Sequence, residues 1–117
     1  MRKFKELHIW KRSVELASTI YSITQNYPDT ERYGLISQMR RCSISISSNI
    51  AEGAARTSKK EFKHFLDISY GSLYELHTQV IISSKLGFIE LDVQAMLETE
   101  IEEIQKMLYS YAQKLIN

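Results

Sequence analysis

The stretch CSISISSNIAEG, residues 42–53, decides how the fold of this chain is interpreted. From Ser43 to Ser47 its serines and isoleucines alternate with a period of two, which is typical of a β-strand. A single strand has no partner with which to pair, however, and the rest of the sequence indicates neither a second strand nor a hairpin. We therefore predict that this stretch is helical and that the fold is all-α.

Helical periodicity extends from this stretch toward both ends of the chain. Apolar residues recur at steps of three and four in four segments, which predict helices over about 6–27, 31–56, 59–86 and 91–116. Four long helices with short connections favour an up-down-up-down antiparallel four-helix bundle. We expect the 117 residues to form a single domain.

Local signals support these helix ends. Pro28 cannot continue a helix, and Asp29-Thr30 offers an N-cap for the second helix. Ser58 and Glu61 are spaced as a capping box, in which the hydroxyl and the carboxylate each satisfy a free amide. Gly87 stands where a left-handed residue often ends a helix.

Composition places the chain among ordinary globular proteins, with 44% hydrophobic and 25% charged residues. A single cysteine, Cys42, excludes an internal disulfide and a site with several cysteine ligands, and it suits a reducing compartment. The sequence shows neither an export signal nor an apolar run long enough to span a membrane. We expect a cytoplasmic protein without a membrane partner.

Catalytic residues are not indicated. His64 and His77 lie 13 residues apart on one predicted helix, so they point about 140° apart and cannot share a metal ion. The third histidine, His8, has no histidine at i, i+4, and the isolated glycines form no phosphate-binding loop. Cys42 falls on an apolar stripe and is expected to be a buried thiol, although a Cys–His dyad across helices stays open. We predict no enzyme activity, no cofactor and no metal site.

The charge distribution is more informative than the net charge of +1. In the predicted topology, the start of the first helix, the second turn and the end of the fourth helix share one end of the bundle. The cations at that end are Arg2, Lys3, Lys5, Lys11, Arg12, Arg56, Lys59, Lys60, Lys63 and Lys114, opposed only by Glu6, Glu52 and Glu61. The acids of the fourth helix, Glu98, Glu100, Glu102 and Glu103, are expected nearer the middle.

This basic cluster predicts a surface for a polyanion. Lysines that merely solvate helix ends are the alternative. Against it, Lys59 and Lys60 occupy a first helical turn, where the helix dipole disfavours cations. Since no aromatic platform is predicted, we expect phosphate contacts with weak sequence preference. The predicted nucleic-acid-binding residues are Arg2, Lys3, Lys5, Lys11, Arg12, Arg56, Lys59, Lys60 and Lys63.

The second helix carries a single charge, Glu52, from Cys42 to Ala55. A helix without a polar outer face is covered on more than one side, so we predict a homo-oligomer in which Ser47→Glu loosens the assembly. The alternative is a solvated serine face. Asn49 on the core stripe is expected to fix register or oligomer state.

Pairing is expected for the other charged residues of this region. Glu52 and Arg56 have the i, i+4 spacing of an ion pair. Arg40 and Arg41 are expected to neutralise Glu75 or another acid across the bundle.

Several ordered motifs resemble a known family. They are Leu7-His8-Ile9-Trp10-Lys11, Gln38-Met39-Arg40-Arg41, Ser48-Asn49-Ile50-Ala51-Glu52-Gly53 with Arg56, Phe65-Leu66, and Gly71-Ser72-Leu73-Tyr74-Glu75-Leu76. The chain resembles the bacterial four-helix-bundle proteins encoded in intervening sequences of 23S ribosomal RNA genes. That family is similar to the accessory protein of diversity-generating retroelements.

The resemblance implies a homopentameric ring and no established catalytic residue. It makes Arg40, Arg41, Asn49, Glu52, Gly53, Arg56 and Glu75 architectural positions. The retroelement relative engages nucleic acid and a reverse transcriptase, which leaves two functional hypotheses. The chain is a non-catalytic module that binds structured RNA, or DNA, or it is an adapter for a nucleic-acid-processing protein such as a reverse transcriptase.

Overall fold

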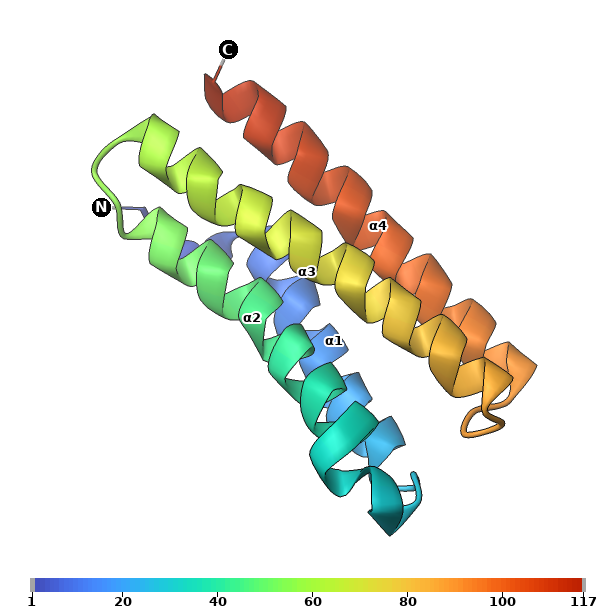
Figure 1. The fold of residues 1–117 in the computed structure, drawn as a ribbon. Coiled ribbons are helices and arrows are strands. Elements are labelled where there is room, and N and C mark those ends of the chain that lie inside the picture. Colours follow the sequence, from blue (N-terminus) through green and yellow to red (C-terminus); the bar gives the residue numbers. More distant parts are fainter. Residues whose placement is uncertain (1, 117) are drawn as a thin grey trace.

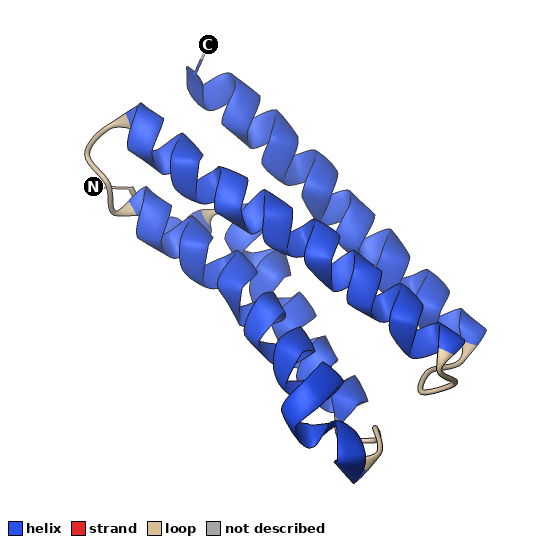
Figure 2. Ribbon diagram, viewed as in Figure 1, coloured by secondary structure: helices blue, strands red, loops and turns tan. Residues whose placement is uncertain are grey.

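Four α-helices make up almost the whole chain in the computed structural model, which describes residues 2–116. They are α1 (His8–Thr24), α2 (Ser37–Ala54), α3 (Lys59–Lys85) and α4 (Leu91–Ile116). Between residues 2 and 116 there is no strand, and the serine–isoleucine stretch lies within α2 (Figure 2). The predicted all-α fold is confirmed.

The helices form an elongated up-down-up-down antiparallel bundle with extents of 43 × 24 × 20 Å. In Figure 1 the N-terminus lies beside the α2–α3 turn, and the connections α1–α2 and α3–α4 lie at the opposite end. No helix in the described part of the chain is both long and apolar enough to cross a lipid bilayer.

The core runs through all four helices. Its largest fully buried side chains are Leu16, Ile20, Met39, Ile46, Ile50, Phe62, Leu66, Leu73, Leu76, Leu97, Ile101 and Ile104. Burying a side chain of this size contributes roughly 1.5–3 kcal/mol relative to leaving it in water. The helical stripes that predicted the fold are therefore the surfaces that hold it together.

Two buried serine hydroxyls are satisfied within the helices that carry them. Ser13 Oγ donates to the carbonyl of Ile9 at 2.6 Å, and Ser83 Oγ donates to the carbonyl of Gln79 at 2.8 Å. These bonds avoid the cost of an unpaired polar group in the core. Serine can thus occupy core-facing positions of the bundle.

Small residues bring α2 and α3 close together. Ser69 Oγ donates across the contact to the carbonyl of Ile46 at 2.8 Å, and Cys42 Sγ donates to the carbonyl of Ser72 at 3.0 Å. Gly53 is buried against α3 near the end of α2. This contact fixes the turn between the two helices, where many of the predicted basic residues lie.

The first helix is shorter than the predicted 6–27. A separate 3₁₀ turn covers Phe4–Glu6, and α1 begins at His8. Tyr27 lies beyond the end of α1, with its ring centroid 5.3 Å from that of Phe88 in the α3–α4 connection. This aromatic pair joins the two connections at one end of the bundle.

The second helix begins later than the predicted residue 31. A 3₁₀ turn (Asp29–Glu31) and a wide π-type turn (Arg32–Ile36) precede α2, with non-helical dihedrals at Gly34 (φ −112°, ψ −112°). The predicted N-cap at Asp29-Thr30 is wrong. Instead, the Glu31 carboxylate accepts a hydrogen bond of 3.2 Å from the amide of Leu35.

The ends of α3 agree closely with the prediction. Ser58 Oγ accepts from the amide of Glu61 at 3.1 Å, as expected for a capping box, and the hydroxyl also contacts the Glu61 carboxylate. Gly87 has the left-handed φ of 79°, with the amide of Phe88 bonded to the carbonyl of Ser83 at 2.9 Å. This is a Schellman C-cap.

Candidate nucleic-acid interface

Three segments meet at one end of the bundle, as the sequence predicted. The Arg2 guanidinium donates to the carbonyl of Arg56 in the α2–α3 turn at 2.5 Å and lies 4.7 Å from the ring centroid of Phe62. A surface groove lined by His8 and Lys114, among others, places the end of α4 beside the start of α1. Residues far apart in sequence therefore share this end.

Six lysines of this end are exposed, and none of them forms an ion pair within residues 2–116: Lys3, Lys5, Lys11, Lys59, Lys60 and Lys114. Together with Arg2 and Arg56 we call them the basic end. Their ammonium groups face water and have no internal carboxylate to neutralise them. Their positive charge is thus available to an external anion.

Arg56 stands at the centre of the basic end. It donates to Glu52 at 3.1 Å, which confirms the predicted i, i+4 pair, and its guanidinium lies 4.7 Å from the ring centroid of Phe65. Its Nε is buried and has no hydrogen-bond partner among the described residues. With Arg2 it lines a groove of about 630 Å³ along the α2–α3 turn. Two arginines thus border one concave surface.

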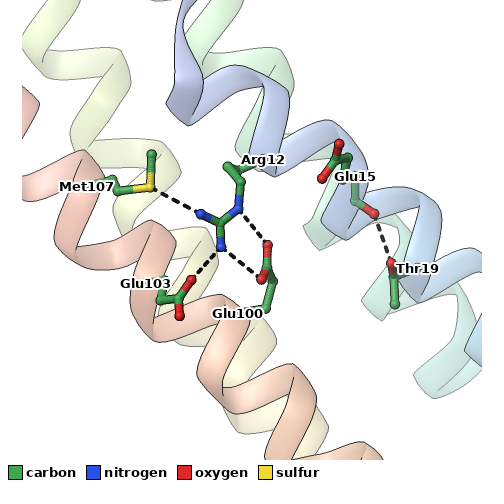
Figure 3. A network of polar contacts seen from close by, with 6 residues as sticks. All are labelled: Arg12, Glu15, Thr19, Glu100, Glu103 and Met107. Atoms are coloured by element: carbon green, nitrogen blue, oxygen red, sulfur yellow. Dashed lines mark hydrogen bonds and ion pairs between the residues drawn. The ribbon is translucent and has the colours of Figure 1, made fainter.

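Arg12 does not belong to this surface. Its Nε and Nη2 each donate to the Glu100 carboxylate at 2.9 Å, and Nη2 also donates to Glu103 at 2.7 Å (Figure 3). The hydrogen bonds to these carboxylates raise the pKa of Arg12 above its ordinary value. The acids of α4 that were expected away from the cations thus neutralise one of them. Arg12 is a link between α1 and α4.

Lys63 is also partly neutralised. Its Nζ lies 3.1 and 2.9 Å from the two carboxylate oxygens of Asp67, one helical turn further along α3. Such an exposed i, i+4 pair contributes only a few tenths of a kcal/mol. Lys63 therefore contributes less net charge to the surface than Lys59 or Lys60.

The predicted partners of Arg40, Arg41 and Glu75 are wrong. Arg40 Nε donates to Thr24 Oγ1 at 2.9 Å, and its guanidinium lies 4.6 Å from the ring centroid of Tyr21, so it ties α2 to α1. Arg41 is exposed and lines a separate groove between α1 and α2, together with Arg40 and Tyr21. Glu75 is exposed and forms no ion pair in the described part of the chain.

Asn49 does not fix register from the core. It is half-buried, and its Nδ2 donates to the carbonyl and the hydroxyl of Ser45 in the same helix, at 2.8 and 3.0 Å. The heptad spacing placed Asn49 on the core stripe, but the side chain lies at the edge of that stripe. Its hydrogen bonds lie within α2 and do not join this helix to another.

Cys42 is buried, as predicted. Burial, with a smaller contribution from the nearby Glu75, raises the pKa of its thiol to about 12. A thiol in this state is a poor nucleophile at neutral pH. Across residues 2–116, no three histidine, cysteine or acidic side chains are grouped so as to hold a metal ion.

Three tyrosines gather on the outer face of α3 and α4, which the sequence reasoning missed. The ring centroid of Tyr70 lies 5.2 Å from that of Tyr74 and 6.3 Å from that of Tyr109. The i, i+4 spacing of Tyr70 and Tyr74 was visible in the sequence. The approach of Tyr109 depends on how α4 packs against α3.

Fold and surface together define a small antiparallel four-helix-bundle protein with one basic end. The sequence model of the 23S rRNA-intervening sequence protein family matches residues 5–110, and the chain belongs to this family. The resemblance to that family is confirmed, whereas similarity to the retroelement accessory protein stays a prediction.

A solved structure shares this fold. It is a protein of unknown function from the S23 ribosomal protein family of Bacteroides thetaiotaomicron, 21% identical, with a TM-score of 0.83. The match covers 90% of this chain and 95% of the other. A comparison with curated proteins found no match.

Proposed function

We propose that this protein is a non-catalytic, homo-oligomeric RNA-binding protein that contacts phosphates through the basic end. The observation that carries the proposal is the set of six exposed lysines without internal ion pairs at one end of the bundle. Family membership supports the choice of RNA indirectly, since the family is named for the intervening sequence of 23S rRNA.

The position of Lys59 and Lys60 strengthens the electrostatic argument. Both lie at the start of α3, which begins at Lys59. The amides of a first helical turn carry partial positive charge and attract phosphate, and the two ammonium groups add to that field. The fold itself gains nothing from cations there, so an external anion is the favourable partner.

Phosphate contact is the mode of binding that this surface supports. Lysine ammonium groups neutralise phosphates without reading base edges, so weak sequence preference is expected. Each neutralised phosphate steepens the salt dependence of the affinity by roughly 0.7–0.9 in a double-logarithmic plot. A homo-oligomer would repeat the surface in each subunit and increase the avidity for one RNA.

The proposed subunit contact lies on the outer face of α2 and α3. Ile44 of α2 and Ile68 of α3 are exposed large apolar side chains, at 43% and 39%. Ser47 does not belong to this face, because only 9% of the residue is exposed and its hydroxyl donates to the carbonyl of Ile44 within its own helix. The family resemblance favours a pentamer.

Substitution of the exposed isoleucines tests whether the subunits assemble through this face. We expect Ile44→Glu with Ile68→Glu to dissociate the oligomer in sedimentation at micromolar concentration. Val14→Glu, on the 39% exposed Val14 of α1, is the matched control. A wild-type protein that sediments at 13.6 kDa contradicts the homo-oligomer.

A substitution that removes two positive charges tests the RNA site. We expect Lys59→Gln with Lys60→Gln to weaken the binding of a structured RNA and to flatten its salt dependence between about 50 and 200 mM by up to roughly two phosphate contacts. Arg32→Gln with Lys85→Gln removes two exposed charges outside the basic end and serves as control. Adding Lys63→Gln is expected to have a smaller effect because of Asp67.

Unchanged affinity and salt dependence in the Lys59/Lys60 variant would show that these lysines only solvate a helix end. The protein would then be better described as an adapter for a nucleic-acid-processing partner. Co-purification of that partner with the wild-type protein would be the next measurement.

A further inference from the structure

We propose that the outer groove between α3 and α4 stacks unpaired bases of single-stranded RNA on Tyr70, Tyr74 and Tyr109. This inference rests on the proposed RNA-binding function and assigns a second, base-contacting site to it. The groove measures about 470 Å³, and its other lining residues are Glu102, Gln105 and Lys106. We call it the tyrosine groove.

The three rings form a platform of suitable shape. Tyr74 and Tyr109 are 53% and 56% exposed, so large parts of their faces are open to a ligand. The hydroxyls of Tyr70 and Tyr74 lie 3.3 Å apart and hold the two rings to each other. Aromatic side chains of this kind stack successive bases with little dependence on sequence.

Polar groups beside the rings fit the edges of bases. Gln105 lines the groove, and its Nε2 is buried without a hydrogen-bond partner among residues 2–116, so this side chain must turn outward before it donates to a base. The Glu102 carboxylate accepts hydrogen bonds of the kind that exocyclic amino groups of bases donate. Lys106 lies beside them and carries the charge that a neighbouring phosphate needs.

The groove is continuous with the proposed phosphate site. A smaller hollow of about 160 Å³ is lined by Lys63 and by both Tyr70 and Tyr109, so it joins the tyrosines to the first turns of α3. Lys63 precedes Tyr70 by seven residues, which is about 10 Å along a helix. A strand held at Lys59 and Lys60 can therefore extend along α3 and place its bases on the rings.

Rings and lysines together favour RNA over a protein partner in this groove. Lys63, which pairs with Asp67, lies toward the start of α3, and Lys106 lies beside Glu102 on α4. A chain of alternating phosphates and flat bases satisfies the lysines and the rings together.

Two probes with equal numbers of phosphates separate stacking from charge. They are a short oligouridine and an abasic oligonucleotide of the same length, titrated against wild-type protein, Tyr74→Ala and Tyr109→Ala. The wild type is expected to bind oligouridine more tightly than the abasic strand. Each alanine variant should lose about five- to 150-fold in affinity for oligouridine and almost nothing for the abasic strand.

Matched variants exclude a general effect of losing a tyrosine. Tyr74→Phe and Tyr109→Phe keep the ring and are expected to retain most of the affinity. Tyr33→Ala removes a tyrosine that is 89% exposed in the turn before α2 and should change nothing. Circular dichroism checks that each variant is folded, and the wild-type comparison of the two probes needs no variant.

Equal binding of both probes by the wild type, or no loss in the alanine variants, overturns the inference. Steep salt dependence that is lost in Lys59→Gln with Lys60→Gln would then still support the proposed function. Alanine variants that sediment differently but bind oligouridine unchanged would show that the groove is a protein contact, which also overturns the inference.

Discussion

A Cβ atom on Gly53 would lie 2.8 Å from Cδ1 of Phe62. It would also lie 2.8 Å from Cβ of Phe65 and 3.2 Å from the carbonyl oxygen of Phe62. The absence of a side chain at Gly53 thus allows the last turn of α2 to pack directly on the first turns of α3. This contact sets the position of Arg56, Lys59 and Lys60 relative to one another.

The first prediction follows from that contact. Gly53→Ala forces a methyl group into space held by a phenylalanine ring and by backbone, and overpacking of this kind costs about 1–3 kcal/mol. We expect the free energy of unfolding to fall by this amount in urea titrations. The better helix propensity of alanine offsets part of the cost.

Gly71→Ala is the matched control. A Cβ at this position of α3 meets nothing within 4 Å, so only the gain in helix propensity remains. The variant should be more stable by up to about 1 kcal/mol. Equal effects of the two substitutions would contradict the packing argument.

The second prediction concerns Arg12. Arg12→Gln removes the ion pairs to Glu100 and Glu103 that join α1 to α4. Because these bonds are charge-assisted but partly exposed, we expect a loss of about 1–2 kcal/mol in the free energy of unfolding. The affinity for RNA at low salt should stay close to that of the wild type, unlike that of Lys59→Gln with Lys60→Gln.

A double-mutant cycle with Glu100→Gln measures the coupling between the two side chains. A coupling energy near zero would mean that the pair is only a surface contact. A large loss of RNA affinity in folded Arg12→Gln would show that Arg12 takes part in RNA binding.

The third prediction uses the raised pKa of Cys42. At a pKa of about 12, roughly one thiol in ten thousand is ionised at pH 8, and thiolate is the reactive form. Alkylation of the native protein at pH 8 should be far slower than in denaturant and should speed up as pH rises toward 12. Fast, stoichiometric labelling of the folded protein at pH 7 would be inconsistent with this burial.

The fourth prediction separates stability from binding. Lys59 and Lys60 stand at the positive end of the α3 dipole, so Lys59→Gln with Lys60→Gln should raise the free energy of unfolding by a few tenths of a kcal/mol. Thermal unfolding at low salt measures the gain, and high salt should abolish it. A clear loss of stability would mean that these lysines support the fold.

Local chemistry made most of the fold predictable. The apolar steps of three and four residues located four helices because each helix buries one continuous stripe. Both ends of α3 were predicted closely because Ser58 and Gly87 act on backbone groups within a few residues of themselves.

The start of α2 was not predictable in the same way. Leu35 and Ile36 continue the apolar pattern, yet the Glu31 carboxylate takes the amide hydrogen of Leu35 and Gly34 leaves helical dihedrals. This competition between a side chain and the backbone does not change the spacing of apolar residues, so the sequence pattern does not reveal it.

Contacts between side chains of different helices could not be predicted from the sequence either. Arg12 was grouped with the other cations by its position in the chain, but its neighbours are set by the approach of α4. The same approach brings Tyr109 to Tyr70. Both depend on the rotation of one helix about its axis, which stripes define only coarsely.

The serine–isoleucine alternation inside α2 has a consequence for the unfolded chain. In the native state, Ser43 and Ser47 bond to carbonyls of their own helix, and Ile46 and Ile50 are fully buried. Once α2 melts, the same segment is an uncharged, proline-free β-former of the kind that nucleates cross-β aggregates. Arg40-Arg41 and Glu52 flank it as charged gatekeepers. Refolding should therefore be cleanest at low protein concentration, where α2 regains its helix before two chains meet.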